Sequence, residues 1–412
     1  MTKKEIFQDL VQLMENDYAG YQDKHVDATP YLERVHEGMS EASFENLVWD
    51  YDRAFQDGHV NSIFLNTEPF TVGFEVRRDQ AGLFIVKVND AQGVVVGDEI
   101  VKLDDDSIDE AAHLYEEQLA EAHERQDWDW LVERYHSITL ATGEQLPLTH
   151  YPDTMELKKA YEQIDDKTGL LTLEDFANPD ELKSLLDSKY DQLEKLEYLI
   201  VDIRTNYGGT DETFWELLNY FVTEPTNLRE LYPENYNYTT HWTPRNRHNW
   251  LNTLETIKEE YHNDYYDKFY AENVAQWENE ETAKIADQER IANPDNPQLT
   301  PKGQIKHIYV LTDVKSISAA DEFALLAKRM KNVTTVGRNT LGIVDYVKIA
   351  RQYYDNLMFL YPTTRQNLID AGEGMLGVGV EPNVFIPWTH ESINRDPDMA
   401  WVLHDIAKLE EE

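Results

Sequence analysis

The chain has 412 residues, 41% of them hydrophobic and 11% aromatic, which is enough to fill the cores of about two to four domains of ordinary size. Its 79 acidic residues against 37 basic residues give a formal net charge of -42, and such a field repels nucleic-acid phosphates and anionic lipid. We therefore expect no nucleic-acid partner and no membrane partner. The absence of cysteine excludes disulfides, thiol catalysis and thiolate metal sites.

The first 66 residues predict a bundle of three helices. Apolar residues recur at helical spacing over residues 4–56, with a break at residues 27–30. The N-terminus lacks the continuous apolar stretch of a signal peptide, and no segment approaches the ~20 apolar residues of a membrane span, so we expect a cytoplasmic protein. The region ends in Gln-Asp-Gly-His-Val, and on residues alone a buried or capping role is the commoner one for its histidine, His59.

Residues 67–150 change to a strand pattern and predict a β-rich module. Apolar and polar residues alternate around turns in three stretches, Phe70–Arg78, Gly82–Asp90 and Gly93–Glu110. These stretches resemble a PDZ domain, whose loop for a terminal carboxylate is matched by Thr-Val-Gly-Phe at 71–74. Successive backbone N–H groups beside an open strand edge can hold such a carboxylate while the peptide adds as a strand. The resemblance implies substrate binding at Val72, Gly73 and Phe74; packing as a lid is the alternative.

Two strand–turn–helix units predict a parallel sheet within residues 151–224 and 301–412. The apolar run Tyr-Leu-Ile-Val-Asp-Ile-Arg at 198–204 leads into Thr-Asn-Tyr-Gly-Gly-Thr and a helix. The run Lys-His-Ile-Tyr-Val-Leu-Thr-Asp at 306–313 leads into a helix that begins near Ser318. Turns of this kind lie at the same end of one sheet, where functional sites form. The expected fold class is therefore α/β.

Residues 225–300 separate these two units and differ from both. An aromatic and polar stretch is followed by a long acidic helical pattern with an apolar face, and then by a Pro-rich linker. We interpret this segment as an insertion in the core. A lid, a substrate clamp and a dimer arm are open alternatives, and the last of these would make the protein a homo-oligomer.

A serine nucleophile needs a strained or helix-N-terminal backbone position, an oxyanion pocket and a base. The residues around Ser318 supply the first two of these features. Ser318 and Ala319 begin a helix, so the amide of Ala319 points toward developing negative charge. Gly208 and Gly209 lack a Cβ, which lets the amides of the other turn approach the same point. No base is evident nearby, and on residues alone an N-cap is the commoner role for Ser318.

Four motifs in one order resemble the C-terminal processing (tail-specific) serine peptidases. Residues 198–209 resemble that family's apolar run followed by Asp-x-Arg-x-Asn-x-Gly-Gly, and Ser-Ala-Ala-Asp-Glu-Phe at 318–323 resembles its Ser-Ala-Ser-Glu, whose first serine is the nucleophile. Residues 336–342 resemble its Val-Gly-x-x-Thr-x-Gly, and residues 377–387 resemble its closing strand. The resemblance implies a crotonase/ClpP-like βα core, a PDZ-like module, a helical N-terminal region, Ser318 as nucleophile and no cofactor.

The sequence departs from that family at the position of its usual base. Members with a Ser-Lys dyad carry lysine directly after the Thr-x-Gly turn, where this chain has Ile343. Lys328 is on the helix of Ser318 itself and Lys348 is in the next strand, so neither takes that position. Another branch, similar to the tricorn core protease and the interphotoreceptor retinoid-binding repeats, lacks the lysine. In the tricorn core protease the base is a histidine ahead of the PDZ-like module, and the Asp-Gly-His segment here resembles that site and implies His59.

A carboxylate is expected to orient this histidine. Asp345, two residues beyond the missing lysine, is the first choice and Glu373 the second, while Tyr346 is a candidate to donate to the substrate. We therefore predict a serine endopeptidase that acts on peptides or unfolded chain ends. The alternative is an inactive relative that binds apolar ligands or peptides, because the same branch includes retinoid-binding repeats.

Overall fold

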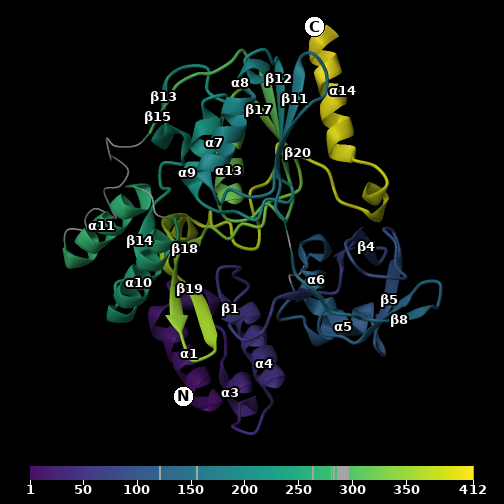
Figure 1. The fold of residues 1–412 in the computed structure, drawn as a ribbon, viewed down its shortest axis with the longest axis vertical. Coiled ribbons are helices and arrows are strands. Elements are labelled where there is room, and N and C mark those ends of the chain that lie inside the picture. The colour runs from purple at the N-terminus through teal and green to yellow at the C-terminus, as the bar shows by residue number, and fades with distance from the viewer. Residues whose placement is uncertain are drawn as a thin grey trace. The chain divides into compact units, whose positions relative to one another are not determined.

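The computed structural model describes residues 1–119, 122–154, 156–261, 264–279, 281, 284 and 297–411. Packing divides the chain into two compact units, and both contain helices and strands, so the fold is mixed α/β (Figure 1). The first unit comprises Met1–Thr67, Pro233–Asn296 and Ile343–Leu376; the second comprises Glu68–Tyr232, Pro297–Gly342 and Gly377–Glu412. Among the described residues, no helix has both the length and the apolar character that crossing a membrane requires.

The main sheet of the second unit has the strand order β10-β11-β12-β16-β17-β20. The strands from β11 to β20 pair in parallel, whereas β10 is an antiparallel edge strand. The residues of β12 and β16 are buried almost throughout, as their apolar runs predict for strands covered on both faces. The strands are β10 (Lys159–Gln163), β11 (Thr168–Leu173), β12 (Tyr198–Asp202), β16 (His307–Thr312), β17 (Val333–Gly337) and β20 (Val384–Phe385).

Helices cover both faces of this sheet (Figure 1). On one face, Val402 and Ile406 of α14 pack with the buried strand residues Tyr198, Tyr309 and Val336. On the other face lie α7, α9 and α13, and α13 contacts both β16 and β17. The helices are α7 (Pro179–Ser188), α8 (Tyr190–Leu193), α9 (Asp211–Leu218), α13 (Ala319–Lys328) and α14 (Pro397–Glu411), with the short η5 (His390–Ile393) before α14.

A second sheet of this unit is antiparallel, with the order β3-β4-β5-β7-β8, so that β3 is an edge strand. Its buried face packs on α5 and α6, where Trp128 is 1% exposed. The elements are β2 (Phe70–Thr71), β3 (Phe74–Arg78), β4 (Leu83–Val88), β5 (Glu99–Leu103), β6 (Asp106–Ser107), α5 (Ile108–Leu114), η1 (His123–Arg125), α6 (Trp128–Val132), β7 (Ser137–Leu140), β8 (Gln145–Pro147) and β9 (Tyr151–Pro152). The short strands β13 (Thr226–Asn227) and β15 (Gln298–Leu299) pair with each other, and η2 (Leu228–Leu231) follows β13.

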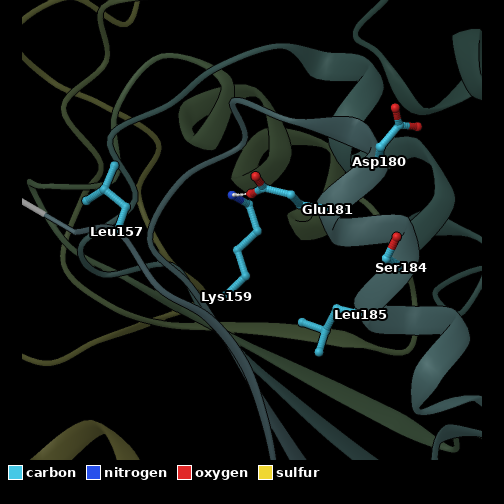
Figure 2. A pocket seen from close by; sticks show the side chains of 6 residues that line it. All are labelled: Leu157, Lys159, Asp180, Glu181, Ser184 and Leu185. Atoms are coloured by element: carbon cyan, nitrogen blue, oxygen red, sulfur yellow. Dashed lines mark hydrogen bonds and ion pairs between the residues drawn. The ribbon is translucent and has the colours of Figure 1, made fainter.

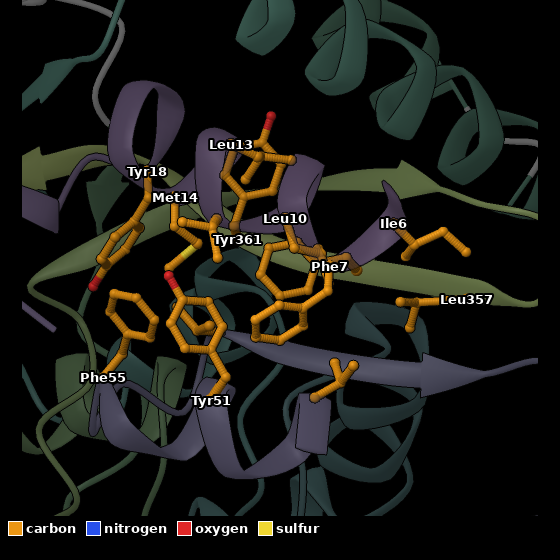
Figure 3. Close-up of a cluster of buried hydrophobic side chains, with 14 of the residues drawn as sticks. Ile6, Phe7, Leu10, Leu13, Met14, Tyr18, Tyr51, Phe55, Leu357 and Tyr361 are labelled. Carbon is orange, nitrogen blue, oxygen red and sulfur yellow. The ribbon is translucent and has the colours of Figure 1, made fainter. Parts of the chain in front are cut away.

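The first unit combines the N-terminal helices with strands from far along the chain. Its central strand β19 pairs with β18 on one side and with β1 and β14 on the other. Phe7 and Leu10 of α1 and Tyr51 of α4 pack with Leu357 and Tyr361 of β19 in one buried cluster (Figure 3). The elements are α1 (Lys3–Asp17), α2 (Tyr21–Lys24), α3 (Thr29–Arg34), α4 (Glu41–Ala54), β1 (Asn61–Phe64), β14 (Tyr238–Thr240), α10 (Pro244–Tyr261), α11 (Asp264–Glu278), β18 (Tyr346–Tyr353), β19 (Leu357–Gln366) and η4 (Asn367–Ala371).

The boundaries of the two units do not coincide with those of the four segments predicted from the sequence. Residues 343–376, which we expected in the core, join the N-terminal region because β19 pairs with β1. Part of the 225–300 insertion joins them too, since Trp250 and Leu254 of α10 belong to the same buried cluster. Hydrophobic periodicity predicts local elements but not which distant strands will pair. Residues 225–232 and 297–300 of the insertion belong to the second unit, whereas residues 262–263, 280, 282–283 and 285–296 lie outside the described residues.

Asp52 of α4 is a buried carboxyl group with little compensation for its charge. It is 2% exposed, so its carboxylate is withdrawn from water. Burial raises the pKa of Asp52 to about 7, and the nearby Ser62 and Arg53 oppose this only in part. The folded state therefore keeps a proton that the unfolded chain releases near pH 4.

We expect the Asp52→Asn variant to gain stability over the wild type by a margin that grows with pH. Because the folded pKa lies above the unfolded one, the wild type loses stability as pH rises from about 4 to about 7, by roughly 4 kcal/mol in all. The amide cannot ionise and escapes this loss. Chemical denaturation at about pH 4 and about pH 8 measures the margin, with the exposed Glu37→Gln as control. An equal margin at both pH values would contradict the buried, protonated Asp52.

Candidate active site

Ser318 lies between β16 and α13 in an unusual backbone conformation. Its φ is 57° and its ψ is -112°, a region that residues other than glycine rarely occupy. Thr2, Ser40 and Ser107 also precede helices in this chain, but their φ values run from -64° to -75°. The backbone of Ser318 thus differs from that of an ordinary N-cap. A strained serine between a strand and a helix is typical of an exposed nucleophile.

Hydrogen bonds tie the segment before Ser318 to the other strand–turn–helix unit. The hydroxyl of Ser316 donates to the carbonyl oxygen of Ile203 at 2.7 Å. The amide of Ile317 donates to the carbonyl oxygen of Asn206 at 2.9 Å. Both acceptors follow β12, so the two turns meet at one end of the parallel sheet, as the sequence predicted.

Gly208 lies directly beside Ser318. A Cβ on Gly208 would stand 2.9 Å from the Cβ of Ser318 and 2.8 Å from the carbonyl oxygen of Ile317. Gly208 has a φ of 82° and Gly209 a φ of 145°, and a Cβ on Gly209 would come within 2.1 Å of another backbone atom. Only glycine fits these two positions without displacing the backbone around the serine.

The three predicted oxyanion donors differ in what their amides bind. The amide of Gly208 donates to the side-chain oxygen of Asn206 at 2.9 Å. The amides of Gly209 and Ala319 donate no hydrogen bond to any residue that the structure describes. Both amides are therefore able to donate to an external acceptor such as an oxyanion. The candidate oxyanion pocket is therefore formed by the amides of Gly209 and Ala319.

The carboxylate of Asp321 joins the serine to the Thr-Leu-Gly turn. One oxygen accepts the amide of Ser318 at 2.8 Å and the other accepts the amide of Gly342 at 2.6 Å. On the same turn, the guanidinium of Arg125 donates to the carbonyl oxygen of Thr340 at 3.0 Å. Sequence reasoning missed Arg125, since a contact across 215 residues with a backbone carbonyl leaves no pattern in the sequence.

In the first unit, His59 is held in a defined orientation. Its Nδ1 lies 2.7 Å from the carbonyl oxygen of Tyr346, which can only accept, so Nδ1 carries the proton and Nε2 the lone pair of the neutral ring. The backbone amide of His59 donates to Asp57 at 3.0 Å, and the hydroxyl of Tyr18 donates to the other oxygen of Asp57 at 2.7 Å. Burial raises the pKa of Asp57, whereas the charge of His59 opposes this rise. With Nδ1 protonated and a lone pair on Nε2, the neutral ring of His59 suits the role of general base.

Asp57 is a residue that sequence reasoning passed over. In an Asx turn, the side chain of an aspartate accepts the backbone amide of the residue two positions later. Asp57 and His59 have this spacing, so the sequence Asp-Gly-His contained a usable signal. The predicted orienting acid, Asp345, instead accepts the amides of residues 375 and 376 at 3.0 and 2.8 Å. No hydrogen bond joins the described side chains of Asp345 and His59. A backbone carbonyl takes the orienting position, and the second choice, Glu373, is exposed.

The hydroxyl of Tyr346 is engaged within the protein. The side chain is 2% exposed, and its hydroxyl donates to Asp23 at 2.8 Å. Asp23 also receives two bonds from Arg365, at 2.7 and 3.0 Å. The side chain of Tyr346 is therefore an anchor for the strand whose carbonyl orients His59.

Lysine does not supply a base at the turn of Ser318. Lys315, three residues earlier, binds Glu75 at 2.8 Å and Asp129 at 3.0 Å. Burial lowers the pKa of Lys315, but these two carboxylates outweigh it and raise the pKa well above the usual value. Lys328 donates to a backbone carbonyl at 2.6 Å. The amine of Lys315 stays charged, so it cannot accept a proton from serine.

The predicted carboxylate-binding loop is closely packed. The side chains of Val72 and Phe74 are 3% and 4% exposed and belong to the buried core of the antiparallel sheet. The carbonyl of Gly73 accepts three amides, from residues 89–91. On the edge strand β3, the amide of Val76 donates to Asp129 at 2.6 Å. The side chains of Val72 and Phe74 therefore pack in the core, and the amide of Val76 on the sheet edge is engaged by Asp129.

A pocket of about 430 Å³ lies between β10 and α7 in the second unit (Figure 2). Its lining is Leu157, Lys159, Asp180, Glu181, Ser184 and Leu185. The amine of Lys159 points toward Glu181 and pairs with it at 2.9 Å and with Asp175 at 2.6 Å. Lys159 is paired with carboxylates, and none of the predicted site residues lines this pocket. The Ser318 region is therefore the stronger candidate for the active site.

Comparison with known proteins agrees with this fold and these motifs. The model of peptidase family S41 matches residues 167–386, more than half of the chain, including both turns. Mature CPAF complexed with lactacystin is similar with a TM-score of 0.66 at 15% identity, covering 99% of this chain and 98% of that one. Mature CPAF alone gives 0.64 at 14%, covering 97% and 95%; a putative peptidase from Parabacteroides merdae gives 0.50 at 14%, covering 98% and 96%. The chain belongs to peptidase family S41, the C-terminal processing serine peptidases.

Proposed function

We propose that this chain is a serine endopeptidase in which Ser318 is the nucleophile and His59 the general base. The observation that carries the proposal is the backbone of Ser318, with a φ of 57° at the start of α13, where the other hydroxyl caps of the chain are extended. Strain of this kind persists only where the surrounding structure enforces it. Here it coincides with the position that the family uses for its nucleophile.

In the proposed reaction, Ser318 Oγ attacks the scissile carbonyl while Nε2 of His59 takes the hydroxyl proton. His59 then gives this proton to the departing amine, and water hydrolyses the acyl-enzyme by the same route. The amides of Gly209 and Ala319 donate to the oxyanion, because no residue described in the structure occupies them. The carbonyl of Tyr346 supports this assignment by keeping the proton of the neutral imidazole on Nδ1.

We assign the chain to the branch similar to the tricorn core protease. The support is chemical: Ile343 replaces the dyad lysine, and Lys315 is neutralised by two carboxylates. The parallel sheet flanked by helices supports a crotonase/ClpP-like core, and the antiparallel sheet with its edge strand β3 supports a PDZ-like module. The helices α1 to α4 support a helical N-terminal region, although their apolar faces pack on β19 as well as on one another.

The substrate class follows from the family and from the charge of the chain. Peptides and unfolded chain ends are the expected substrates, and a formal charge of -42 disfavours polyanionic ones. Because Val72 and Phe74 are buried, any grip on a chain end in the antiparallel sheet would use backbone groups.

A fluorophosphonate probe tests the nucleophile. We expect covalent labelling of the wild type at Ser318, located by mass spectrometry of the digested protein, and none in Ser318→Ala. Ser40→Ala is the matched control: it removes an ordinary N-cap, at a cost of about 1 kcal/mol of stability, and should keep full labelling. An unlabelled wild type that binds apolar ligands would overturn the proposal in favour of the inactive relative.

A further inference from the structure

Tyr18, the residue that ends α1 in the first unit, contacts both groups that hold His59. Its hydroxyl donates to Asp57 at 2.7 Å, and the other oxygen of Asp57 accepts the backbone amide of His59 at 3.0 Å. Its ring packs against the ring of Tyr346 with 5.7 Å between the centroids, and the carbonyl oxygen of Tyr346 binds Nδ1 of His59. Two different residues therefore hold the backbone and the ring of His59, and Tyr18 touches both of them.

The side chain of Tyr18 is closely held in its own place. It is 2% exposed, and its ring also packs against Phe55 with 5.6 Å between the centroids (Figure 3). The amide of the next residue, Ala19, donates to the carbonyl oxygen of Pro362 in β19 at 3.1 Å. Burial, and then the charge of Asp57, raise the pKa of Tyr18 well above its usual value, so the hydroxyl keeps its proton and remains a donor.

The turn that carries His59 depends on Asp57. The carbonyl oxygen of Asp57 accepts the amide of Val60 at 2.9 Å, which closes the turn from Asp57 to Val60 around the histidine. Asp57 is 4% exposed, and a buried carboxylate that loses a donor shifts toward another donor or toward water. Such a shift would move the backbone of His59 while its ring stays bonded to Tyr346. The position of Nε2 therefore depends on the hydrogen bond from Tyr18 to Asp57.

Gly20 shows how closely Tyr18 and Tyr346 are fitted to each other. A Cβ on Gly20 would stand 2.4 Å from the hydroxyl oxygen of Tyr18 and 2.9 Å from the ring of Tyr346. The backbone of Gly20 has a φ of -94° and a ψ of 0°, a conformation open to residues with a Cβ. The collision with the two rings, and not backbone strain, therefore accounts for glycine at this position.

We propose that Tyr18 is a positioning residue for His59: it links the two groups that hold His59 and so fixes the position of the base in acylation. The inference rests on the proposed function, in which His59 is the general base for Ser318. Because Tyr18 is buried, it acts on the reaction through His59 and not through contact with the substrate. Its loss should therefore lower kcat and leave KM unchanged.

The test compares Tyr18→Phe in two backgrounds of the full chain. Phenylalanine keeps the ring and removes only the hydroxyl, so the rate constant for fluorophosphonate labelling and kcat for peptide hydrolysis should fall by about tenfold or more, with KM unchanged. In the His59→Ala background the same change should have no further effect on the labelling rate, because the residue through which Tyr18 acts is gone. A merely structural loss would lower the rate by the same factor in both backgrounds.

The matched control is Tyr354→Phe. Tyr354 belongs to the same unit, and its hydroxyl also donates to a carboxylate, that of Asp9 at 2.8 Å. It directly follows β18, however, whereas Tyr346 begins that strand, so Tyr354 lies the length of the strand away from the carbonyl that binds His59. Its loss should leave the labelling rate, kcat and KM at their wild-type values.

The outcomes separate this inference from the proposed function. A wild type that is not labelled contradicts the nucleophile, and His59→Ala labelled at the wild-type rate contradicts the base. If both assignments stand, labelling of Tyr18→Phe at the wild-type rate, or an equal loss in the His59→Ala background, overturns the positioning role alone. If circular dichroism shows that Tyr18→Phe does not fold, Gly20→Ala displaces the ring of Tyr18 by collision and gives the same comparison.

Discussion

Replacement of His59 by alanine should lower the rate constant for fluorophosphonate labelling of Ser318 by about 10²- to 10⁴-fold, the range typical of a lost general base. The reason is the orientation of the ring. With Nδ1 donating to the carbonyl of Tyr346 at 2.7 Å, the lone pair of the neutral imidazole is on Nε2, as a general base requires. The measurement is the second-order rate constant, taken from the time course at several probe concentrations.

The matched control is His390→Ala. His390 is also oriented by hydrogen bonding, with Nδ1 2.8 Å from Asp79, but it lies beside Phe84, which is remote in sequence from both turns of the site. Its loss should leave the labelling rate unchanged. Labelling of His59→Ala at the wild-type rate would remove His59 from the mechanism.

The elements around the nucleophile could be predicted because their signals are local. The buried runs of β12 and β16 are continuous in the sequence, and the helix after Ser318 begins within one residue of its expected start. The glycines of the first turn were predictable for the same reason. A close approach of two backbones demands residues without a Cβ, and Gly208 and Gly209 supply them.

The surroundings of His59 were not predictable, because a backbone carbonyl does the orienting. Every residue has a carbonyl group, so the contact with Tyr346 leaves no trace in the residue types. Sequence reasoning chose a nearby carboxylate, Asp345, which accepts the amide of Met375. The strand that carries Tyr346 reaches this place because β19 pairs with both β18 and β1. Pairing between segments nearly 300 residues apart is decided by the packing of the whole unit, not by any local period.

Substitution of Gly208 by alanine should lower the labelling rate of Ser318 by about 10²-fold or more. The new Cβ would stand 2.8 Å from the carbonyl oxygen of Ile317 and 2.9 Å from the Cβ of Ser318. Neither neighbour is the end of a flexible side chain, so the segment that carries the nucleophile must move. A shift of about 1 Å is enough for such a loss of rate. The φ of 82° adds a strain of about 1 kcal/mol for any residue with a Cβ.

Gly143→Ala separates the collision from the backbone strain. Gly143 has a φ of 86°, close to that of Gly208, but a Cβ there would meet nothing within 4 Å. The control should therefore lose about 1 kcal/mol in the free energy of unfolding while keeping the labelling rate. Gly208→Ala should lose both stability and labelling rate. Its loss of rate relative to Gly143→Ala measures how far the reaction of Ser318 depends on close contact with the glycine turn. Equal rates in the two variants would show that Ser318 reacts without that contact, which contradicts the site assembled from these two turns.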